Sequence, residues 1–361
     1  MAGNSNLTAS ARNKQDEFYT QLSMIESELK HYRQHFTNKV VLCNCDDPYE
    51  SNFFKYFAMN FNSLGLKKLI TTCYASSPVT GKEFEYYVNK GGQLSFIPND
   101  TPVKAENEKR PYKVEITEVT DENGDGRIDL ADVEFLMRNK KNTMTLLDGD
   151  GDFRSPECVE LLKEADIVVT NPPFSLFRDY VALLMKYNKQ FLIIGNLNAI
   201  KYKEILPLFM TDKIWLGCNS GHYWFKVPDS YEEKKTDFKI DENGQKWRRM
   251  GNICWYTNLD TERRHEDMTL FRQYDPLKYP KYDNYDAIEV SKTADIPCDY
   301  YGIIGVPITF MTKHNPEQFS IVGVLNSGCA NKYDFAKAVL NGKQLYARIL
   351  IQRKQVNTNE N

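Results

Sequence analysis

The chain has 361 residues, of which 41% are hydrophobic and 26% are charged, as expected for a globular protein with a large core and room for a second lobe. Its net charge of −3 argues against indiscriminate binding of polyanions by the whole molecule, yet leaves room for a local basic cleft. The eight cysteines show neither zinc-site spacing nor the framework of a small secreted domain. Because the sequence shows no apolar leader and no run of membrane-spanning length, we expect a soluble, cytoplasmic protein.

The N-terminal part of the chain predicts a β-α-β unit. Residues 1–13 are mostly small or polar, with several Asn and Ser, and are expected to be disordered. From Lys14 onward, the spacing of apolar residues predicts an amphipathic helix. Strands at 39–45 and 67–75 follow, on either side of a phenylalanine-rich helix. This succession predicts a right-handed crossover and a parallel, doubly wound sheet.

Between residues 76 and 142 the regular periodicity is lost, and the charged stretch 104–113 is expected to be solvated. The alternation of strands and helices resumes at residue 143. The expected helices span 156–164 and 175–188, and the expected strands span 143–147, 166–170, 191–195, 213–218 and 252–258. From about residue 262, interleaved Arg, Lys, Tyr and Pro predict a second, less regular lobe.

The most informative motif is Asn171-Pro172-Pro173-Phe174, which follows the apolar strand 166–170. The two prolines end the strand and remove two backbone donors, so nearby carbonyls are left to accept from another group. In open α/β sheets, ligands bind at the carboxyl ends of the strands. There the Asn171 oxygen and the Pro172 carbonyl are suited to accept the two N–H bonds of an exocyclic amine, while the Phe174 ring stacks on its base. The alternative is a motif that merely ends a strand.

This motif resembles the Asn-Pro-Pro-aromatic motif of S-adenosylmethionine-dependent amino-methyltransferases, whose commonest target is adenine N6. The resemblance implies that the methyl donor is held by Asn171 together with Phe18-Tyr19-Thr20 before the first strand, the acidic loop residues Asp46 and Asp47, and the pair Asp152-Phe153. The acidic loop is equally compatible with an Asp/Pro turn that caps a helix. Thr72-Cys73-Tyr74 stands where the ribose-binding acid is expected, so the ribose contact stays unassigned.

Longer stretches make the resemblance more specific. Residues 44–48, 51–57, 150–155, 167–177, 279–287 and 306–310 together resemble the EcoRI modification methylase family of DNA adenine-N6 methyltransferases. The resemblance implies an α/β fold with a doubly wound, mostly parallel, seven-stranded methyltransferase sheet and an irregular C-terminal DNA-recognition lobe. It implies a catalytic domain at 14–260, with an acidic insertion at about 100–142, and a target-recognition region at 261–361.

The same resemblance implies an activity and partners. The protein is expected to transfer a methyl group from S-adenosylmethionine to the N6 amine of an adenine that has been flipped out of double-stranded DNA. It is expected to act as a monomer that bends DNA. The implied setting is restriction–modification or phage protection, with a cognate restriction endonuclease that acts on the same site.

Basic side chains towards the C-terminus are candidates for contacts with phosphates or base edges. They are Arg248, Arg249, Arg263, Arg264, His265, Arg272 and Lys281. The alternative for each is an ordinary solvated surface cation.

One acidic segment departs from the family pattern. Asp121, Asn123, Asp125, Arg127 and Asp132 occupy positions 1, 3, 5, 7 and 12 of a calcium-loop spacing. Asp at position 12, where EF-hands carry Glu, resembles the dockerin loop. The segment predicts a calcium site that acts as a structural clip, and the alternative is an Asx-turn loop that caps a helix.

Two other functions remain open at this stage. A protein-glutamine or ribosomal-RNA guanine-N2 methyltransferase would use the same Asn-Pro-Pro-aromatic motif on the same fold. A DNA- or calcium-binding module on a methyltransferase-like scaffold would have lost donor binding.

Overall fold

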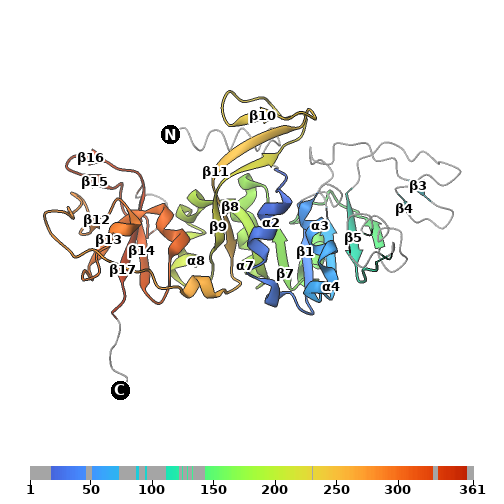
Figure 1. Ribbon diagram of the computed structural model, residues 1–361, viewed down its shortest axis with the longest axis horizontal. Helices are drawn as coiled ribbons and strands as arrows, with labels where there is room; N and C mark the ends of the chain where they lie inside the picture. The colour runs from blue at the N-terminus through green and yellow to red at the C-terminus, as the bar shows by residue number, and fades with distance from the viewer. Residues whose placement is uncertain are drawn as a thin grey trace, which may run out of the picture. The chain divides into compact units, whose positions relative to one another are not determined.

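The computed structural model describes residues 18–45, 51–72, 87–88, 94–95, 111–121, 124, 128, 132, 143–229, 231–327 and 332–355. The chain forms two compact units, drawn in Figure 1. Unit 1 consists of Met1–Gly195 and Gly221–Gly251, and unit 2 consists of Asn196–Ser220 and Asn252–Asn361. The residues predicted to be disordered, 1–13, lie outside the described residues.

The main sheet has nine strands in the order β10-β11-β8-β7-β1-β2-β5-β6, with β9 paired to β11. The strands are β1 Val40–Cys43, β2 Lys68–Thr72, β5 Tyr112–Ile116, β6 Thr143–Leu146, β7 Ile167–Thr170, β8 Gln190–Asn196, β9 Trp215–Lys226, β10 Phe238–Ile240 and β11 Lys246–Thr257. The core strands β2, β1, β7 and β8 pair in parallel, whereas β5, β6 and β10 pair antiparallel with their neighbours. Strands β1 and β7 are buried on both faces, as expected for a parallel sheet covered by helices.

Short helices cover this sheet. They are α2 Leu22–Leu29, η1 Arg33–His35, α3 Asn52–Met59, α4 Phe61–Leu64, α6 Pro156–Glu164, η3 Phe174–Leu176 and α7 Phe177–Lys186. Ser51 and Ser155 cap α3 and α6 by accepting hydrogen bonds from the backbone N–H three residues on. Gly65 ends α4 with a φ of 63°, a left-handed conformation that glycine adopts without strain. Helix α3 packs on α2 and on β2 (Figure 1).

Unit 2 contains a second sheet, of four strands in the order β12-β13-β17-β14. Its elements are η4 Leu197–Lys201, α8 Leu206–Met210, η5 Glu262–His265, β12 Ile288–Glu289, η6 Thr293–Asp295, β13 Ile303–Pro307, η7 Ile308–Lys313, β14 Phe319–Leu325 and β17 Arg348–Arg353. Two small hairpins stand apart from both sheets: β15 Val339–Leu340 with β16 Lys343–Gln344, and β3 Tyr87–Val88 with β4 Leu94–Ser95. Asn341 and Gly342, both at positive φ, form the two-residue turn of the first hairpin.

A buried ion pair holds the sheet of unit 2 together. Arg348 on β17 donates to both carboxylate oxygens of Glu289 on β12, at 2.8 to 3.1 Å. The Tyr282 and Ser291 hydroxyls also donate to Glu289. Burial, followed by the Glu289 carboxylate, raises the pKa of the Tyr282 phenol, so it stays a donor. Gly305 is required at its place on β13 because an added Cβ would lie 2.1 Å from the Tyr282 hydroxyl.

The fold corrects several expectations. The main sheet has nine strands rather than the expected seven, with β10 at one end of the strand order and β5 and β6 at the other. The stretch from 76 to 142 contains a regular strand, β5, whose residues alternate between buried and half-buried, and Tyr112 is buried instead of solvated. The C-terminal lobe was expected to be irregular, but it contains a sheet of its own with four strands. The helix expected from Lys14 onward is α2, which begins at Leu22; residues 18–21 precede it as a non-helical segment, and residues 14–17 lie outside the described ranges.

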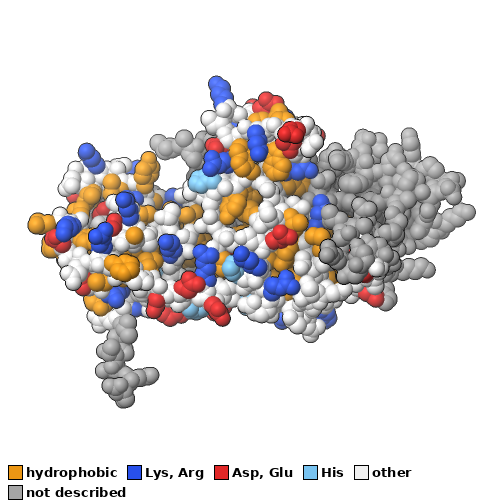
Figure 2. All heavy atoms as spheres, viewed as in Figure 1, with side chains coloured by type: hydrophobic (Ala, Val, Ile, Leu, Met, Phe, Trp, Pro, Cys, Tyr) orange, Lys and Arg blue, Asp and Glu red, His pale blue; other side chains and the backbone are white. Residues whose placement is uncertain are grey.

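The surface of the described residues carries interspersed charges. On the face in Figure 2, basic and acidic side chains alternate instead of forming one basic block. This pattern agrees with the net charge of −3. Among the described residues, no helix has both the length and the apolar character needed to cross a membrane.

Candidate active site and nucleic-acid interface

Strands β1 and β7 end side by side at the carboxyl edge of the main sheet. Leu42 of β1 is in register with Val168 of β7, so the residues after the two strands are neighbours. The Thr170 hydroxyl donates to the Asn44 carbonyl and ties the two strand ends together. Asparagines 44 and 171 therefore follow adjacent parallel strands at the edge where α/β proteins bind ligands.

The Asn171 side chain has one engaged end and one unpartnered end. Its Nδ2 donates to the carbonyl of Phe18 over 2.7 Å, which sets the orientation of the amide. Its Oδ1 is buried and has no hydrogen-bond partner among the described residues. The residue as a whole is 6% exposed. A buried acceptor of this kind is rare in folded proteins and calls for a donor from outside the described chain.

The rest of the Asn-Pro-Pro-Phe motif lies around this oxygen. The Pro173 carbonyl accepts from the Leu176 backbone N–H at 3.0 Å, whereas no backbone donor to the Pro172 carbonyl is found in the described part of the chain. The Phe174 ring is buried and lies 5.8 Å from the Phe18 ring, tilted by 40°. The motif thus places two acceptors and an aromatic ring in one short segment, and their roles in binding an amine stay a prediction.

Residues 18–20 are held in place by three separate elements. The Phe18 carbonyl accepts from Asn171, the Tyr19 N–H donates to the Lys226 carbonyl at 3.0 Å, and the Thr20 carbonyl accepts from the Asn52 side chain at 2.7 Å. The Thr20 hydroxyl oxygen is buried without a partner in the described residues. The segment predicted to hold the methyl donor therefore lies directly against Asn171.

Two further aromatic residues lie near the Phe18 ring. The rings of Phe225 and Tyr231 lie 5.9 and 6.1 Å from the Phe18 ring. Sequence reasoning did not identify either residue. Phe225 stands in the aromatic run Tyr223-Trp224-Phe225, but only the pairing of this strand with Tyr19 brings it to the site.

Asn44 differs from Asn171 although both are buried at adjacent strand ends. Its Oδ1 accepts from the Tyr180 hydroxyl, so its amide oxygen is satisfied inside the protein. Burial raises the pKa of Tyr180 well above the ordinary value, so this hydroxyl remains a donor. Of the two asparagines, Asn171 is the one with an acceptor left for a substrate.

The pair Asp152-Phe153 has internal partners. Both Asp152 oxygens accept from the Arg154 guanidinium, at 2.8 and 2.6 Å, and these bonds hold the pKa of the Asp152 carboxyl below its usual range. The Phe153 ring is buried and meets the Tyr180 ring edge-on at 4.9 Å. A hydrogen bond from the donor's adenine to Asp152 would therefore compete with Arg154, and this contact remains a prediction.

Other predicted site residues lie partly outside the described chain. Asp46 and Asp47 are outside it, as are Asn123, Asp125 and Arg127 of the calcium-loop spacing. Asp121 is described, and its Oδ1 accepts from the Gly124 N–H at 2.7 Å, an Asx-type turn. Asp132 is fully buried. Within the described ranges no cluster of three or more His, Cys, Asp or Glu side chains is placed to hold a metal. Calcium binding therefore stays a prediction.

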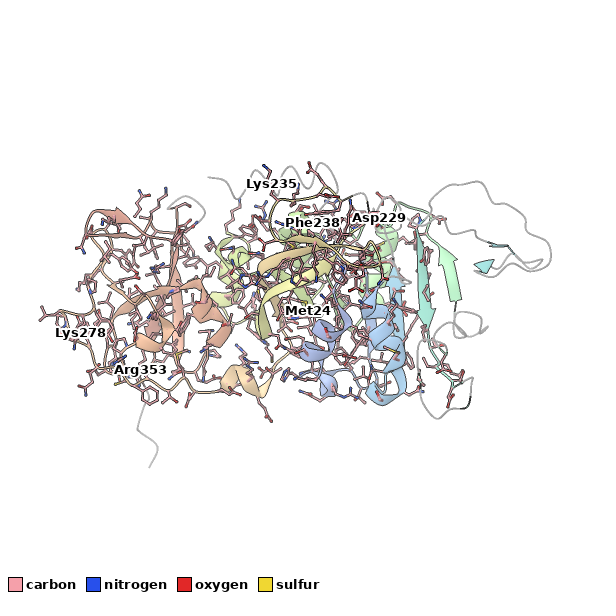
Figure 3. The ribbon with its side chains drawn as sticks, turned by 45° about the horizontal axis from the view of Figure 1, so that its top comes forward. Met24, Asp229, Lys235, Phe238, Lys278 and Arg353 are labelled. Atoms are coloured by element: carbon pink, nitrogen blue, oxygen red, sulfur yellow. The ribbon has the colours of Figure 1, made fainter. Side chains whose placement is uncertain are left out.

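In unit 1, Arg248 and Arg249 lie on β11 next to β10. Arg248 donates to the backbone carbonyls of Thr236 and Asp237, and Arg249 lies 3.8 Å from the Asp237 carboxylate. Phe238 of β10 and the nearby Lys235 are labelled in Figure 3. Arg248 thus has a structural role in this hairpin, whereas Arg249 is exposed and only weakly paired.

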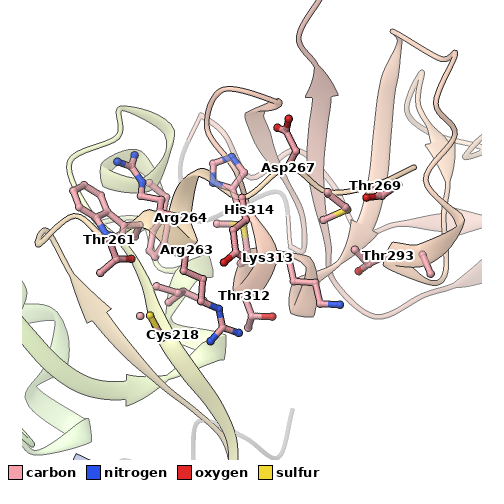
Figure 4. A pocket seen from close by; sticks show the side chains of 18 residues that line it. Cys218, Thr261, Arg263, Arg264, Asp267, Thr269, Thr293, Thr312, Lys313 and His314 are labelled. Atoms are coloured by element: carbon pink, nitrogen blue, oxygen red, sulfur yellow. The ribbon is translucent and has the colours of Figure 1, made fainter. Parts of the chain in front are cut away.

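In unit 2, the neighbouring residues Arg263, Arg264 and His265 have different surroundings. The Arg264 guanidinium stacks on the Trp215 ring at 3.8 Å and pairs with Asp212 at 2.9 Å. His265 bonds both Asp260 and Glu317 at 2.9 Å. Arg263 is exposed and lines a cavity of about 410 Å³, shown in Figure 4.

The remaining basic candidates in unit 2 are ion-paired at the surface. Arg272 lies 3.4 Å from Asp295, and Lys281 lies 2.7 Å from Asp286. Exposed pairs of this kind contribute little to stability and do not prevent a cation from binding a phosphate. Their role in DNA binding stays a prediction.

Comparison with known proteins identifies the family. Residues 6–354 match the family described as adenine-specific methyltransferase EcoRI. The chain belongs to this family. It is 46% identical to the type II methyltransferase M.EcoRI of Escherichia coli, with 98% of each chain covered. It is 34% identical to M.MgeORF184P of Mycoplasma genitalium, over 95% of this chain and 97% of that protein. It is 33% identical to M.MpnI of Mycoplasma pneumoniae, over 95% and 96% respectively.

No solved structure matches the chain significantly. Membership nevertheless confirms the sequence-based identification of the protein as an adenine-specific DNA methyltransferase of type II. It implies S-adenosylmethionine as the methyl donor and a restriction–modification setting. The protein-glutamine, ribosomal-RNA and non-catalytic alternatives are thereby set aside.

Proposed function

We propose that the enzyme methylates N6 of an adenine that has left the DNA duplex, with Asn171 Oδ1 and the Pro172 carbonyl accepting from its amine. The observation that carries this proposal is the buried, unpartnered Oδ1 of Asn171, whose amide orientation is set by the Phe18 carbonyl. Leaving a buried acceptor unpaired costs about 1–3 kcal/mol. A substrate amine that supplies the missing donor offsets this cost.

The chemistry follows from what two acceptors do to an aromatic amine. The lone pair of adenine N6 is delocalised into the ring, which makes the nitrogen a weak nucleophile. Hydrogen bonds to Asn171 and Pro172 favour a pyramidal, electron-rich nitrogen, and they stabilise the positive charge that develops on it during methylation. The methylated nitrogen then loses a proton to water, so no basic side chain is needed.

The aromatic rings are proposed to hold the base and to respond to its entry. Phe174 would stack on the adenine, and positioning would supply much of the remaining rate enhancement. Because Oδ1 is buried, we expect the side chains that cover it to move when the base enters. Extrusion from the duplex costs a few kcal/mol, which contacts in the pocket offset.

The residues of the donor site fit S-adenosylmethionine in part. When bound, this molecule supplies an electrophilic methyl group on a sulfonium sulfur. The buried hydroxyl of Thr20, which has no partner among the described residues, supports a polar ligand here. Phe18, Tyr19, Thr20, Asp46, Asp47, Asp152 and Phe153 are proposed to line its site.

The regional roles and partners are part of the same proposal. We assign catalysis to 14–260 and target recognition to 261–361. The enzyme is proposed to act as a monomer and to protect the site cut by a cognate endonuclease.

The test is to replace Asn171 by alanine. Removing a transition-state hydrogen-bond partner typically lowers turnover by roughly 10²–10³-fold, and here we expect at least the upper value because the amine loses its side-chain acceptor. S-adenosylmethionine binding, measured by calorimetry, should stay close to wild type. Methyl transfer to a duplex that contains the target site would be measured with labelled donor.

The matched control is Asn62→Ala. The Asn62 side chain also donates to a distant carbonyl, that of Val119 at 3.0 Å, but it lies at the surface. This variant should turn over normally. Wild-type turnover in Asn171→Ala would refute the assignment of Asn171, and an equal loss in both variants would show that the effect comes from folding.

A further inference from the structure

The cavity of unit 2 carries exposed cations at one rim. It is lined by residues from five segments of this unit, among them η5 and η7. Arg263 of η5 and Lys313 of η7 lie on the same side of the opening in Figure 4. Both are exposed, and neither side chain has an ion pair or hydrogen bond with another described residue. Unpaired donors of this kind are suited to an anion.

The backbone that carries Arg263 is fixed by the two residues that follow it, Arg264 and His265. Arg264, whose side chain is 13% exposed, is held by the Trp215 ring and by Asp212. His265 is held between Asp260 and Glu317, and its carbonyl accepts from the Asn315 side chain at 3.1 Å. The guanidinium of Arg263 is therefore presented from a rigid turn, which reduces the entropy lost when it binds a ligand.

Some of the acidic residues around the cavity are already paired with cations other than Arg263 and Lys313. Asp212, Asp260 and Glu317 are already paired with Arg264 and His265. Asp267 lies on the opposite rim in Figure 4 and accepts from Asn315 at 3.1 Å. Glu266 also lines the cavity. A single anionic group bound between Arg263 and Lys313 faces two cations, whereas a large polyanion filling the whole cavity would meet these carboxylates.

The neutral side chains at the cavity favour a phosphate ester over a bare ion. The Thr269 and Thr293 hydroxyls line it and add neutral donors, while Met268 and Met311 provide apolar surface for a sugar. A guanidinium and an ammonium together match the several oxygens of a phosphate group. In DNA recognition, such phosphate contacts set the register of the protein on the duplex.

We propose that Arg263 and Lys313 grip one phosphodiester of the DNA substrate at the rim of this cavity. The site rests on the proposed function only in taking DNA as the substrate, and it is independent of the role of Asn171. It separates the three consecutive basic candidates by role: Arg263 binds DNA, whereas Arg264 and His265 hold the turn that presents it.

The test is DNA binding without methyl donor, measured as a function of salt. Each neutralised phosphate contributes about 0.9 to the slope of log K against log salt concentration. The double variant Arg263→Ala/Lys313→Ala should lower that slope by about one and weaken binding about tenfold at moderate salt, equally for cognate and non-cognate duplexes. When the phosphates of the duplex are replaced one at a time by neutral methylphosphonates, one replacement should lower the DNA affinity of the wild type but not that of the double variant.

The control is Lys278→Ala, which removes an exposed cation of unit 2 that is paired with Asp275 at 3.2 Å. It should leave the slope unchanged. An unchanged slope in the double variant would show that these residues bind no phosphate. A slope lowered by about two would show that they bind two phosphates and do not share one. If inorganic phosphate binds to the wild type only, but DNA affinity is equal in both proteins, the site serves a free anion and the proposal fails. Thermal unfolding of each variant shows that the fold is kept.

Discussion

The carboxyl edge of unit 1 and the cavity of unit 2 are chemically opposite. At the first, a buried amide oxygen has no donor among the described residues. At the second, two exposed cations have no acceptor within the described part of the chain. An amine and a phosphate are the groups that complete them, and a nucleotide in DNA carries both. In both places, the side chain that lacks a hydrogen-bond or ion-pair partner indicates which ligand group could bind there, whereas the residue type alone does not.

Asparagines 44 and 171 show this within one site. Both follow buried parallel strands, and both are almost completely covered. The amide oxygen of Asn44 is used by Tyr180, and that of Asn171 is used by no described residue. The same contrast separates Arg264 from Arg263 in unit 2. If this contrast holds, Asn171 and Arg263 bind the substrate, whereas Asn44 and Arg264 stabilise the fold.

After the loss expected for Asn171→Ala, the next largest effect is expected for Asn171→Asp. An ionised carboxylate would place an oxygen against the Phe18 carbonyl, where Nδ2 now donates over 2.7 Å. Burial raises the pKa of a carboxyl group, and its protonated form restores a donor to Phe18 and an acceptor for the amine. We expect turnover roughly 10²-fold below wild type at pH 8, with the deficit shrinking as the pH falls. A pH–rate profile of both proteins measures this. A deficit that grows as the pH falls would contradict the role of the Phe18 carbonyl.

A large loss of stability is expected when the buried carboxylate of Glu289 loses its partner Arg348. The side chains of Glu289 and Arg348 are 4% and 12% exposed. Removing one member of a buried ion pair costs about 3–5 kcal/mol, so Arg348→Met should lower the free energy of unfolding by about 3 kcal/mol. The double variant Glu289→Gln/Arg348→Met should recover at least half of this loss, because a neutral amide still accepts from Tyr282 and Ser291. Urea unfolding measures both, and equal losses in the two variants would contradict the pairing argument.

A smaller, pH-dependent effect is expected at His265. The hydrogen bond with Asp260, followed by that with Glu317, raises the pKa of His265 above its ordinary value. A folded-state pKa above the unfolded one adds stability that is fully present below about pH 6.5 and is lost as the pH rises through the folded value. His265→Gln should therefore destabilise more at pH 5.5 than at pH 8.5, when urea midpoints are compared. Because these groups are largely exposed, high salt should reduce the difference, and a pH-independent difference would show that His265 acts only through packing.

Local sequence predicted much of unit 1. The apolar runs of β1, β2, β7 and β8 depend on nearby residues, and these four strands lie close to where they were expected. Strand β5 was missed because it lies at the edge of a charged region, where only the alternation of Tyr112, Val114 and Ile116 indicates a strand. The sheet of unit 2 was missed because its short strands pair out of sequence order, in a pattern that local periodicity does not contain.

For this protein, the order of residues alone determined the Asn-Pro-Pro-Phe motif at a strand end and the adenine-specific methyltransferase family, since both are properties of contiguous segments. Tertiary structure alone decided which polar groups remain unpartnered. The amide of Asn171 is oriented by Phe18, 153 residues earlier in the chain, and Arg264 is paired by Asp212, 52 residues earlier. Partners so far apart in the sequence meet only when the chain has folded, and so hydrogen-bond satisfaction, unlike residue type, is a property of the fold.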